Sequence, residues 1–507
     1  MRGAFAPHAY NSRMTASAHR HELYTVDQVR ALDRRAIDTL GIPGYELMQR
    51  AAAAALACLR QHWPRARRIA VYCGPGNNGG DGFLLAMLAR EAGCHAEVVA
   101  LGDSRGDDAI RARREFEESG GVVHVWHDEL VLPEADVQVD ALFGTGLQRA
   151  LSPEVATLVQ RMRATGCPLL ALDVPSGVNA DTGAVPGEAI HADVTITFIA
   201  AKRGLYTGFA PGYVGQVQWD PLGLPETLWH GFHADAELMH PATLPPRPRQ
   251  AHKGDNGHVL AIGGEHGTAG AIRLCGEAAL RAGAGLVSIA TRGEHLVALN
   301  AARPELMAHE VHGPQALDEL MQRATVLAVG PGLGQGAWGH ALWVTALDAG
   351  KPLVLDADGL NLLAREPRPF KGSTVITPHP GEAARLLGSD TAAIAADRYA
   401  AVRELARRYD AVAVLKGAGS LVADPSGQVA VCPWGNPGMA SGGMGDLLTG
   451  IVAALLAQGC DAWQAACLGV GLHARAGDLA ARHHGERGLI ASDLLEPLRL
   501  LLNGRES

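Results

Sequence analysis

Short apolar runs that end in clusters of glycine are the feature that most constrains this fold. Glycine accounts for 62 of the 507 residues, about 12% against roughly 7% in an average protein. The excess gathers after apolar runs such as Arg68–Cys73 and is followed by helical patterns, as expected of tight strand-to-helix turns. Short apolar strands that alternate with helices indicate a parallel sheet covered on both faces. The sequence therefore predicts an α/β protein.

The length and the proline distribution indicate two such blocks. A chain of 507 residues is too long for one hydrophobic core. Residues 221–250 carry six prolines and few apolar runs, which is typical of a linker. We predict a disordered extension over residues 1–22, a three-layer α/β/α domain of Rossmann-like type over 23–228, a linker over 229–248 and a second α/β domain over 249–505.

Secondary structure within the blocks follows from the same pattern. Thr25 and Gln28 form a capping box that begins a helix ending near Gly41, and a second helix is expected from Tyr45 to His62. After strand Arg68–Cys73 we expect a loop over Gly74–Gly82. The other strands expected in the first block are His95–Leu101, Val122–Trp126, Val137–Phe143, Pro168–Val174 and Val194–Ile199. In the second block they are His258–Ile262, Leu286–Ala290, Val326–Val329, Pro352–Leu355, Thr374–Ile376 and Val412–Leu415, followed by helices over Asp446–Gln458, Ala462–His483 and Ser492–Leu501.

Composition restricts the partners. The net charge of −9 provides no electrostatic footprint for nucleic acid. No apolar run approaches the roughly 18 residues that a membrane helix needs, and the N-terminal residues lack the apolar segment of a secretory signal. The eight cysteines are scattered without C-x-x-C pairing, which favours reduced thiols over a disulfide framework or a metal site. We expect a cytoplasmic enzyme that acts on small molecules and forms a homo-oligomer.

The run Gly435–Asp446 predicts a phosphate socket. Glycines that open onto a helix present unobstructed backbone N–H groups to an anion. A carboxylate at Asp446 would repel a phosphate, but it suits a base that deprotonates an attacking hydroxyl. The alternative is a glycine-rich turn in which Asp446 is an ordinary helix cap.

Three loops in the first block predict a second site. Gly74–Gly82, Asp140–Leu147 and Asp173–Gly177 each follow an expected strand. In an open α/β sheet these loops lie at the carboxyl edge, where ligands bind. Tight turns and helix caps explain one such loop but explain three poorly. The two asparagines in the first loop suit a cation or a nucleotide-ribose phosphate, and differ from a dinucleotide-binding fingerprint.

The second block resembles a known family. Gly443-Met444-Gly445-Asp446 looks like the anion-hole motif of ribokinase-like kinases, and the longer run looks like the ADP-dependent NAD(P)H-hydrate dehydratases. Residues 250–500 match that branch in order, at Lys253–Asp255, His258–Gly264, Gly330–Gly334, Asp356–Asn361, Thr377–Glu382 and Lys416–Ser420. The resemblance implies a ribokinase-like fold that uses ADP, with Mg²⁺, as phosphoryl donor and releases AMP and phosphate. Whether the donor is ADP or ATP does not follow from the residues.

The first block, over residues 24–225, resembles the NAD(P)H-hydrate epimerase domain, which is fused to the dehydratase in many bacteria. Together the resemblances imply repair of hydrated NADH and NADPH: epimerisation of the R and S hydrates at C6, and dehydration of the S hydrate. A vitamin-type kinase with an accessory ligand-binding domain is the alternative, although it leaves the first block unexplained. A non-catalytic nucleotide sensor would not need Asp446.

The resemblances also imply site residues. In the epimerase the hydrate would be held by Asn77, Asn78, Gly79, Gly80, Asp81, Gly144, Thr145, Gly146, Leu147, Gln148, Arg149 and Ala150, with Asp173 facing the reacting ring. K⁺ would be coordinated by Asn78, Asp140 and Ser176, whose oxygen ligands suit a hard cation. In the dehydratase, Asp446 would be the base, and the hydrate would contact Ala271, Gly332, His379 and Asp446. The nucleotide would be held by Lys416, Gly417, Ala418, Gly419, Ser420 and Gly445.

Overall fold

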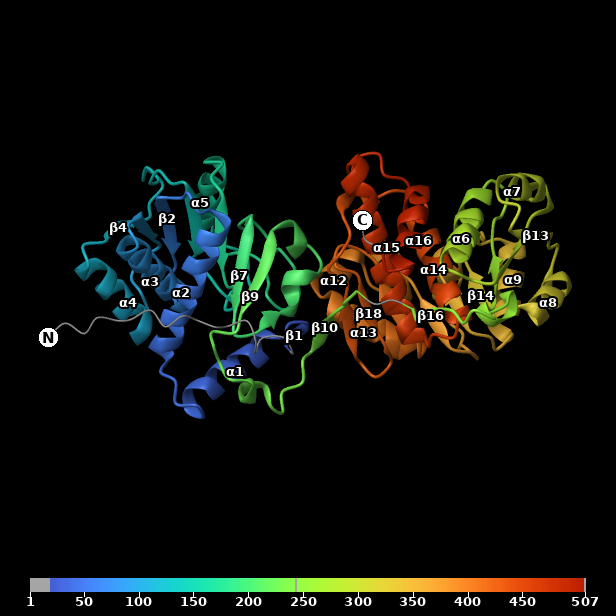
Figure 1. Ribbon diagram of the computed structural model, residues 1–507, viewed down its shortest axis with the longest axis horizontal. Coiled ribbons are helices and arrows are strands. Elements are labelled where there is room, and N and C mark those ends of the chain that lie inside the picture. The colour runs from blue at the N-terminus through green and yellow to red at the C-terminus, as the bar shows by residue number, and fades with distance from the viewer. Residues whose placement is uncertain (1–18, 242–243, 506–507) are drawn as a thin grey trace. The chain divides into compact units, whose positions relative to one another are not determined.

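The computed structural model describes residues 19–241 and 244–505 of the chain. Residues 1–18 of the predicted extension over residues 1–22 therefore lie outside the described residues. The chain divides into two compact units between Ala236 and Glu237. Figure 1 colours the first unit from blue to green and the second from green to red. The domain boundaries at 228 and 249 stay a prediction. Within the predicted linker, Trp229 is buried in the core of the first unit and Met239 in the core of the second.

The first unit is built around a seven-stranded sheet of order β4-β3-β2-β5-β6-β7-β9, in which the neighbouring strands run parallel. The strands of this unit are β1 (Glu22–Tyr24), β2 (Arg68–Cys73), β3 (His95–Ala100), β4 (Val122–Val125), β5 (Val137–Ala141), β6 (Leu169–Leu172), β7 (Val194–Phe198), β8 (Ala201–Lys202) and β9 (Gln216–Asp220). Of these, β1 and β8 pair with each other and lie outside the seven-stranded sheet. Its helices are α1 (Val26–Asp38), α2 (Gly44–His62), α3 (Asn77–Glu91), α4 (Asp107–Glu118) and α5 (Pro153–Ala164).

Both faces of this sheet are buried. Along β2, Val71 packs into the cluster formed with α1–α4, whereas Ala70 and Tyr72 pack into the cluster formed with α5. Burial on both faces is the reason why the strand reads as a continuous apolar run. The predicted three-layer α/β/α architecture is confirmed, and the predicted capping box at Thr25 begins α1.

The second unit has the strand order β13-β12-β11-β14-β15-β16-β17-β18-β19-β10. Its strands are β10 (Ala236–Leu238), β11 (His258–Ile262), β12 (Leu286–Thr291), β13 (Met307–Glu310), β14 (Val326–Val329), β15 (Leu353–Leu355), β16 (Thr374–Ile376), β17 (Val412–Leu415), β18 (Leu421–Ala423) and β19 (Val429–Val431). Its helices are α6 (Ala269–Arg281), α7 (Leu296–Ala302), α8 (Pro314–Arg323), α9 (Ala337–Asp348), α10 (Ala357–Arg365), α11 (Pro380–Leu387), α12 (Thr391–Ala396), α13 (Arg398–Tyr409), α14 (Met444–Ala457), α15 (Ala462–His484) and α16 (Leu495–Leu502).

The structure corrects the expected elements in two places. Helix α3 begins at Asn77, so the predicted loop ends at Gly76 and the following glycines belong to the helix. Strands β1, β8, β9, β10, β13, β18 and β19 were not predicted; β18 pairs antiparallel with both β17 and β19. All of them but β9 have only two to four residues, too short to show a period of their own.

Each sheet has one pair of neighbouring strands from which the chain continues toward opposite edges of the sheet, which is called a switch point. In the first unit this switch point lies between β2 and β5, and in the second between β11 and β14. The loops that follow these strands touch: a Cβ at Gly74 would lie 1.7 Å from the Leu142 carbonyl oxygen, and one at Gly263 would lie 2.1 Å from that of Pro331. Ligands of open α/β sheets bind at switch points, and the predicted sites lie at both.

Candidate active sites

A cavity of about 710 Å³ opens at the switch point of the first unit. Its wall contains most of the predicted hydrate-binding residues: Asn77, Asn78, Asp81, Gly144, Thr145, Gly146, Leu147, Arg149 and Asp173. Five further residues, which sequence analysis missed, add charge to the same wall: Arg30, Asp33, Arg105, Asp108 and Lys202. None of the five belongs to a glycine motif, so the local pattern gave no signal for them.

Four predicted residues do not line this cavity: Gly79, Gly80, Gln148 and Ala150. The two glycines are packing positions of α3. A Cβ at Gly79 would lie 1.9 Å from the Gly74 carbonyl oxygen, and one at Gly80 would lie 2.7 Å from the Met48 sulfur. The glycines thus let the helix N-terminus come close to the strand-end loop, and their contact with the hydrate stays a prediction.

Asp140 and Ser176 form a buried polar pair. The Ser176 hydroxyl donates to Asp140 Oδ1 at 2.7 Å, and the Ser176 backbone N–H donates to Oδ2 at 2.8 Å. Burial raises the pKa of Asp140 to about 6 against the lowering effect of these hydrogen bonds. Both polar atoms of the Asn78 side chain are buried without a hydrogen-bond partner. Such an amide calls for a ligand or water, and its oxygen is a suitable donor to a hard cation.

Asp173 follows β6 in the left-handed region, with φ of +66°. Its Oδ1 accepts a hydrogen bond from the Thr197 hydroxyl at 3.3 Å and forms an ion pair with Lys202. Three other carboxyls line the same cavity, those of Asp33, Asp81 and Asp108. Burial and the charge of Asp173 raise the pKa of Asp81, and burial raises that of Asp33. Carboxyls with a raised pKa in a cavity are a frequent mark of acid–base sites.

The predicted phosphate socket lies at the N-terminus of α14. The helix begins at Met444, with Gly443 in the left-handed region as its N-cap. Asp446 therefore occupies the first turn and is not the cap, which removes the capping alternative. Burial and the neighbouring Asp356 carboxylate raise the pKa of Asp446 to about 6. A carboxylate with a pKa close to neutrality is suited to accept a proton at physiological pH.

A charged cluster lies beside this socket. The Lys416 ammonium is 2.7 Å from Asp356 Oδ1 and 3.9 Å from Glu382 Oε2, and the Thr449 hydroxyl donates to Asp356 Oδ2 at 2.8 Å. Burial raises the pKa of Glu382 to about 7. A Cβ at Gly445 would lie 3.2 Å from Lys416 Nζ, so only a glycine lets the helix approach the ammonium this closely.

The cluster changes the expected role of Lys416. Its ammonium is already paired with Asp356, so contacts from the Lys416–Ser420 loop to a nucleotide would come chiefly from the backbone. Asp356 and Glu382 lie in motifs that match the dehydratase family, but the sequence predicted no role for either residue. Thr449 lies in an apolar helix and gave no signal.

His379 is the N-cap of α11. Its Nδ1 accepts the Gly381 backbone N–H at 3.0 Å, and its Nε2 lies 3.4 Å from Glu382 Oε1. Half of its side chain is exposed, so the histidine is available to a ligand. Burial and the charge of Lys416 lower the pKa of His379, which favours the neutral imidazole.

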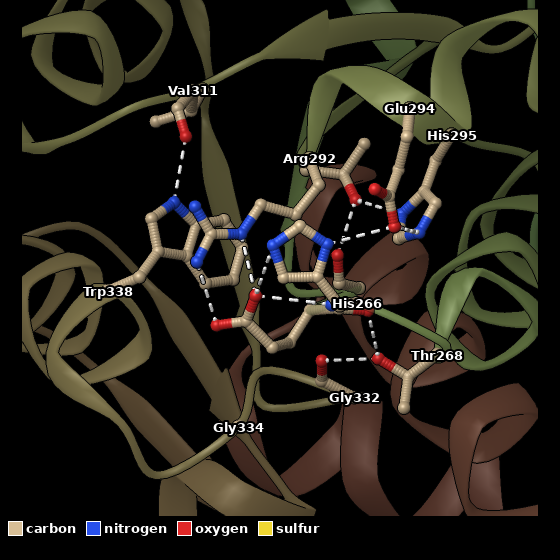
Figure 2. A network of polar contacts seen from close by, with 12 residues as sticks. His266, Thr268, Arg292, Glu294, His295, Val311, Gly332, Gly334 and Trp338 are labelled. Carbon is tan, nitrogen blue, oxygen red and sulfur yellow. Dashed lines mark hydrogen bonds and ion pairs between the residues drawn. The ribbon is translucent and has the colours of Figure 1, made fainter.

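Gly332 is held by a polar network at the second switch point (Figure 2). Its carbonyl oxygen accepts the Glu265 backbone N–H at 2.6 Å and the Thr268 hydroxyl at 2.8 Å. Glu265 accepts two hydrogen bonds from Arg292, whose guanidinium lies 4.2 Å from the centre of the Trp338 ring. Because the carbonyl is occupied, Gly332 can offer a ligand its N–H. Ala271 lies on the first turn of α6, next to this network.

Comparison with known proteins covers both units. The family model described as NAD(P)H-hydrate dehydratase matches residues 259–499, and that of the YjeF-related protein N-terminus matches residues 44–204. The chain is 46% identical to the bifunctional NAD(P)H-hydrate repair enzyme of Coxiella burnetii, over 95% of this chain and 99% of that protein. It is also 46% identical to that of Escherichia coli, over 95% of this chain and 94% of that protein.

This chain belongs to the bifunctional NAD(P)H-hydrate repair enzymes. The family resemblance of both sequence blocks, the α/β fold of two domains and the two enzyme activities expected from them are confirmed. A solved structure of the ADP/ATP-dependent NAD(P)H-hydrate dehydratase of Bacillus subtilis, co-crystallised with ATP and Mg²⁺, is 30% identical. It covers 52% of this chain and 94% of its own, with a TM-score of 0.48.

Proposed function

We propose that the first unit interconverts the R and S hydrates of NADH and NADPH at C6, and that the second dehydrates the S hydrate with ADP as donor. The single observation that carries the proposal is the proton-accepting carboxylate of Asp446 in the first turn of α14, beside a glycine-rich anion socket. A socket for phosphate alone would not place a carboxylate there.

In the first unit, the arginines of the cavity wall would hold the phosphates of the hydrate. Arg30, Arg105 and Arg149 all line the cavity, and guanidinium groups bind phosphate through paired N–H donors. Asp173 would face the hydroxyl-bearing ring carbon. This arrangement separates the groups that bind the substrate's charge from the group that acts on its ring.

K⁺ would be held by Asn78, Asp140 and Ser176. The unpartnered Asn78 amide and the buried Asp140 carboxylate supply oxygens of the kind that a hard cation prefers. When bound, K⁺ would supply a fixed positive charge near the substrate. Asp140→Ala should weaken the dependence of epimerisation on K⁺, and unchanged K⁺ dependence would remove this ligand set.

In the second unit, Asp446 accepts the proton of the C6 hydroxyl while that oxygen attacks the β-phosphorus of ADP. AMP leaves, and the Gly442–Gly445 amides stabilise the transferring phosphoryl group. The lone pair of the ring nitrogen then expels phosphate from C6, and loss of a C5 proton restores the NAD(P)H ring. Mg²⁺ would arrive on the nucleotide's phosphates, which is how proteins usually hold it in such sites.

The test uses the purified chain with mixed hydrate epimers and either ADP or ATP. Recovery of NAD(P)H absorbance with release of phosphate and AMP from ADP supports the proposal, and the nucleotide that gives the higher kcat/KM is the donor. A stable phosphorylated product without absorbance recovery would instead support the kinase alternative. Without nucleotide, chromatography of the two epimers isolates the activity of the first unit.

The remaining expectations concern location and assembly. None of the described helices combines the length and apolar character that a membrane crossing needs. We propose a cytoplasmic location because the substrates are products of reduced nicotinamide nucleotides and all eight cysteines are free thiols. The homo-oligomer stays a prediction, which light scattering of the purified chain would check.

A further inference from the structure

Lys202 is a lysine inside the core of the first unit. Only 1% of the residue is exposed, yet it reaches the wall of the epimerase cavity. An unpaired ammonium at such depth would cost several kcal/mol, so a buried lysine needs anionic or carbonyl partners. The partners therefore indicate why the residue is there.

Lys202 is committed to one carboxylate. Its ammonium forms an ion pair with Asp173 Oδ1 and donates to the Phe198 carbonyl oxygen at 2.8 Å. The Thr197 hydroxyl donates to the same Oδ1 at 3.3 Å. The two acceptors of the ammonium, the Asp173 carboxylate and the Phe198 carbonyl oxygen, leave it little freedom to bind a substrate phosphate, a task for which the arginines of the wall are better placed.

The other oxygen of Asp173 is directed to the cavity. A Cβ at Gly144 would lie 3.1 Å from Asp173 Oδ2, and Gly144 belongs to the loop that lines the cavity. Among the described residues, no hydrogen bond to Oδ2 is present. One carboxylate oxygen is thus fixed by Lys202 and Thr197, and the other faces the space that the hydrate would occupy.

The backbone at Asp173 makes this support necessary. A residue other than glycine with φ of +66° is in a sparsely populated region that persists only where the surroundings hold it. The ion pair to Lys202 is the strongest side-chain contact that acts on this residue. Loss of the lysine would release both the charge and the orientation of the carboxylate.

We propose that Lys202 is the positioning residue of the epimerase, holding Asp173 so that its Oδ2 faces the reacting ring. The inference rests on the proposed epimerase function and on the role of Asp173 in it. It assigns Lys202 to orientation and not to binding of the substrate phosphates. The conversion rate kcat should therefore depend on Lys202 more strongly than KM does.

The experiment compares Lys202→Ala with Arg203→Ala in the full chain, without nucleotide. Arg203 is the adjacent cation, less buried than Lys202, which pairs with Asp235 at 2.6 Å and lies outside the cavity wall. A displacement of about 1 Å costs roughly 100-fold in rate. Lys202→Ala should therefore lower kcat for epimerisation roughly 10- to 100-fold with little change in KM. Arg203→Ala should retain kcat within a few fold, because Arg203 does not line the cavity.

Chemical rescue separates orientation from general stability. Lys202→Ala vacates the volume of the side chain, and added methylammonium should restore part of the lost kcat in a saturable way. Arg203→Ala should show no such response. Absence of rescue, or a parental kcat in Lys202→Ala, would overturn the assignment. Dehydration of the S hydrate, measured on the same preparation, reports whether the second unit is intact.

Two further variants keep the outcome clear. If Lys202→Ala does not fold, Thr197→Val removes the second donor to Oδ1 and should lower kcat by a few fold at unchanged KM; an unchanged kcat would then contradict the assignment. Asp173→Asn tests the proposed function itself. Parental epimerisation in Asp173→Asn would remove Asp173 from the reaction, a result distinct from failure of Lys202 alone.

Discussion

Asp173, directly after β6, and Asp446, at the end of a glycine-rich run, are both carboxylates of the candidate sites, yet their surroundings differ. Asp173 has a lysine of its own, Lys202. The lysine near Asp446 is Lys416, which already pairs with Asp356 at 2.7 Å. Asp446 is therefore left with burial and a like charge, which raise its pKa. The same residue type is thus held as an ion pair in one unit and beside a like charge in the other.

Replacing Asp446 should separate activity from stability. Positioned proton transfer contributes about 10²–10⁴-fold, so Asp446→Asn should slow dehydration by at least that order while nucleotide binding survives. Asp461→Asn is the matched control, because Asp461 caps α15 through the Gln464 backbone N–H and Asn caps about equally well. Turnover, nucleotide affinity and melting temperature decide the matter. Near-parental turnover of Asp446→Asn would exclude Asp446 as the base.

The pH dependence follows from the raised pKa of Asp446. The base must be ionised, so kcat/KM for dehydration should fall tenfold per pH unit below about pH 6. The folded carboxyl holds its proton more tightly than the unfolded one, so its stabilising contribution is complete below pH 3.8 and is lost as the pH rises through 6. At pH 8, Asp446→Asn should therefore be as stable as the parent or more so, by up to about 3 kcal/mol, because folding raises the pKa from 3.8 to about 6. Denaturant unfolding at pH 5 and pH 8 checks this sign.

At the scale of elements, α3 shows how glycine can serve packing within a ligand site. Its first turn begins at Asn77, and the cavity wall receives Asn77, Asn78 and Asp81. Gly79 faces the Gly74 carbonyl oxygen instead. The motif therefore supplies the ligand-facing residues of the turn together with the glycines that let the turn approach the strand end.

Gly79→Ala should displace this turn. The new Cβ would lie 1.9 Å from the Gly74 carbonyl oxygen, a contact that backbone movement must relieve. We expect the loss of about 1–3 kcal/mol of unfolding free energy typical of overpacking and a raised KM for epimerisation. Dehydration should be unchanged. Gly212→Ala is the control, since nothing lies within 4 Å of its Cβ and φ is not left-handed; a Gly79→Ala chain that matches this control would contradict the packing role.

At the scale of the whole molecule, the two units carry their own cores and their own sites. Asp235 pairs with Arg203 in the first unit, whereas Ala236 begins β10, which pairs with β19 in the second. The predicted linker is thus not wholly polar. It contributes Trp229 to the core of the first unit and Met239 to the core of the second. A division of the chain belongs between Asp235 and Ala236.

Expression of residues 1–235 and 236–507 as separate chains should yield two folded enzymes. The first should interconvert the epimers without nucleotide, and the second should consume only the S hydrate. Mixing them should restore complete consumption of an epimer mixture. Epimer chromatography and NAD(P)H absorbance report the two activities. Insoluble or inactive fragments beside an active full chain would show that each core depends on the other unit.

Some of this protein could be predicted from local sequence and some could not. Strand β11 and helix α2 agree with expectation within a residue, because burial on both faces and helical periodicity are local properties. Asp446 stood out as an acid in a glycine-rich turn and Asp173 as an acid directly after an expected strand. The short β18 and β19 were missed, because three residues carry no periodicity.

Sequence by itself determined the two α/β units, their switch-point loops and the acids within them, because each is encoded in adjacent residues. Only the tertiary structure decided which cation serves which acid. Lys202 lies 29 positions from Asp173, and Lys416 lies 60 positions from Asp356. Parallel strands place such residues side by side at one edge of a sheet however far apart they are in the chain. The pKa and the orientation of an ionisable side chain depend on those neighbours, and the local sequence does not show which neighbours it will have.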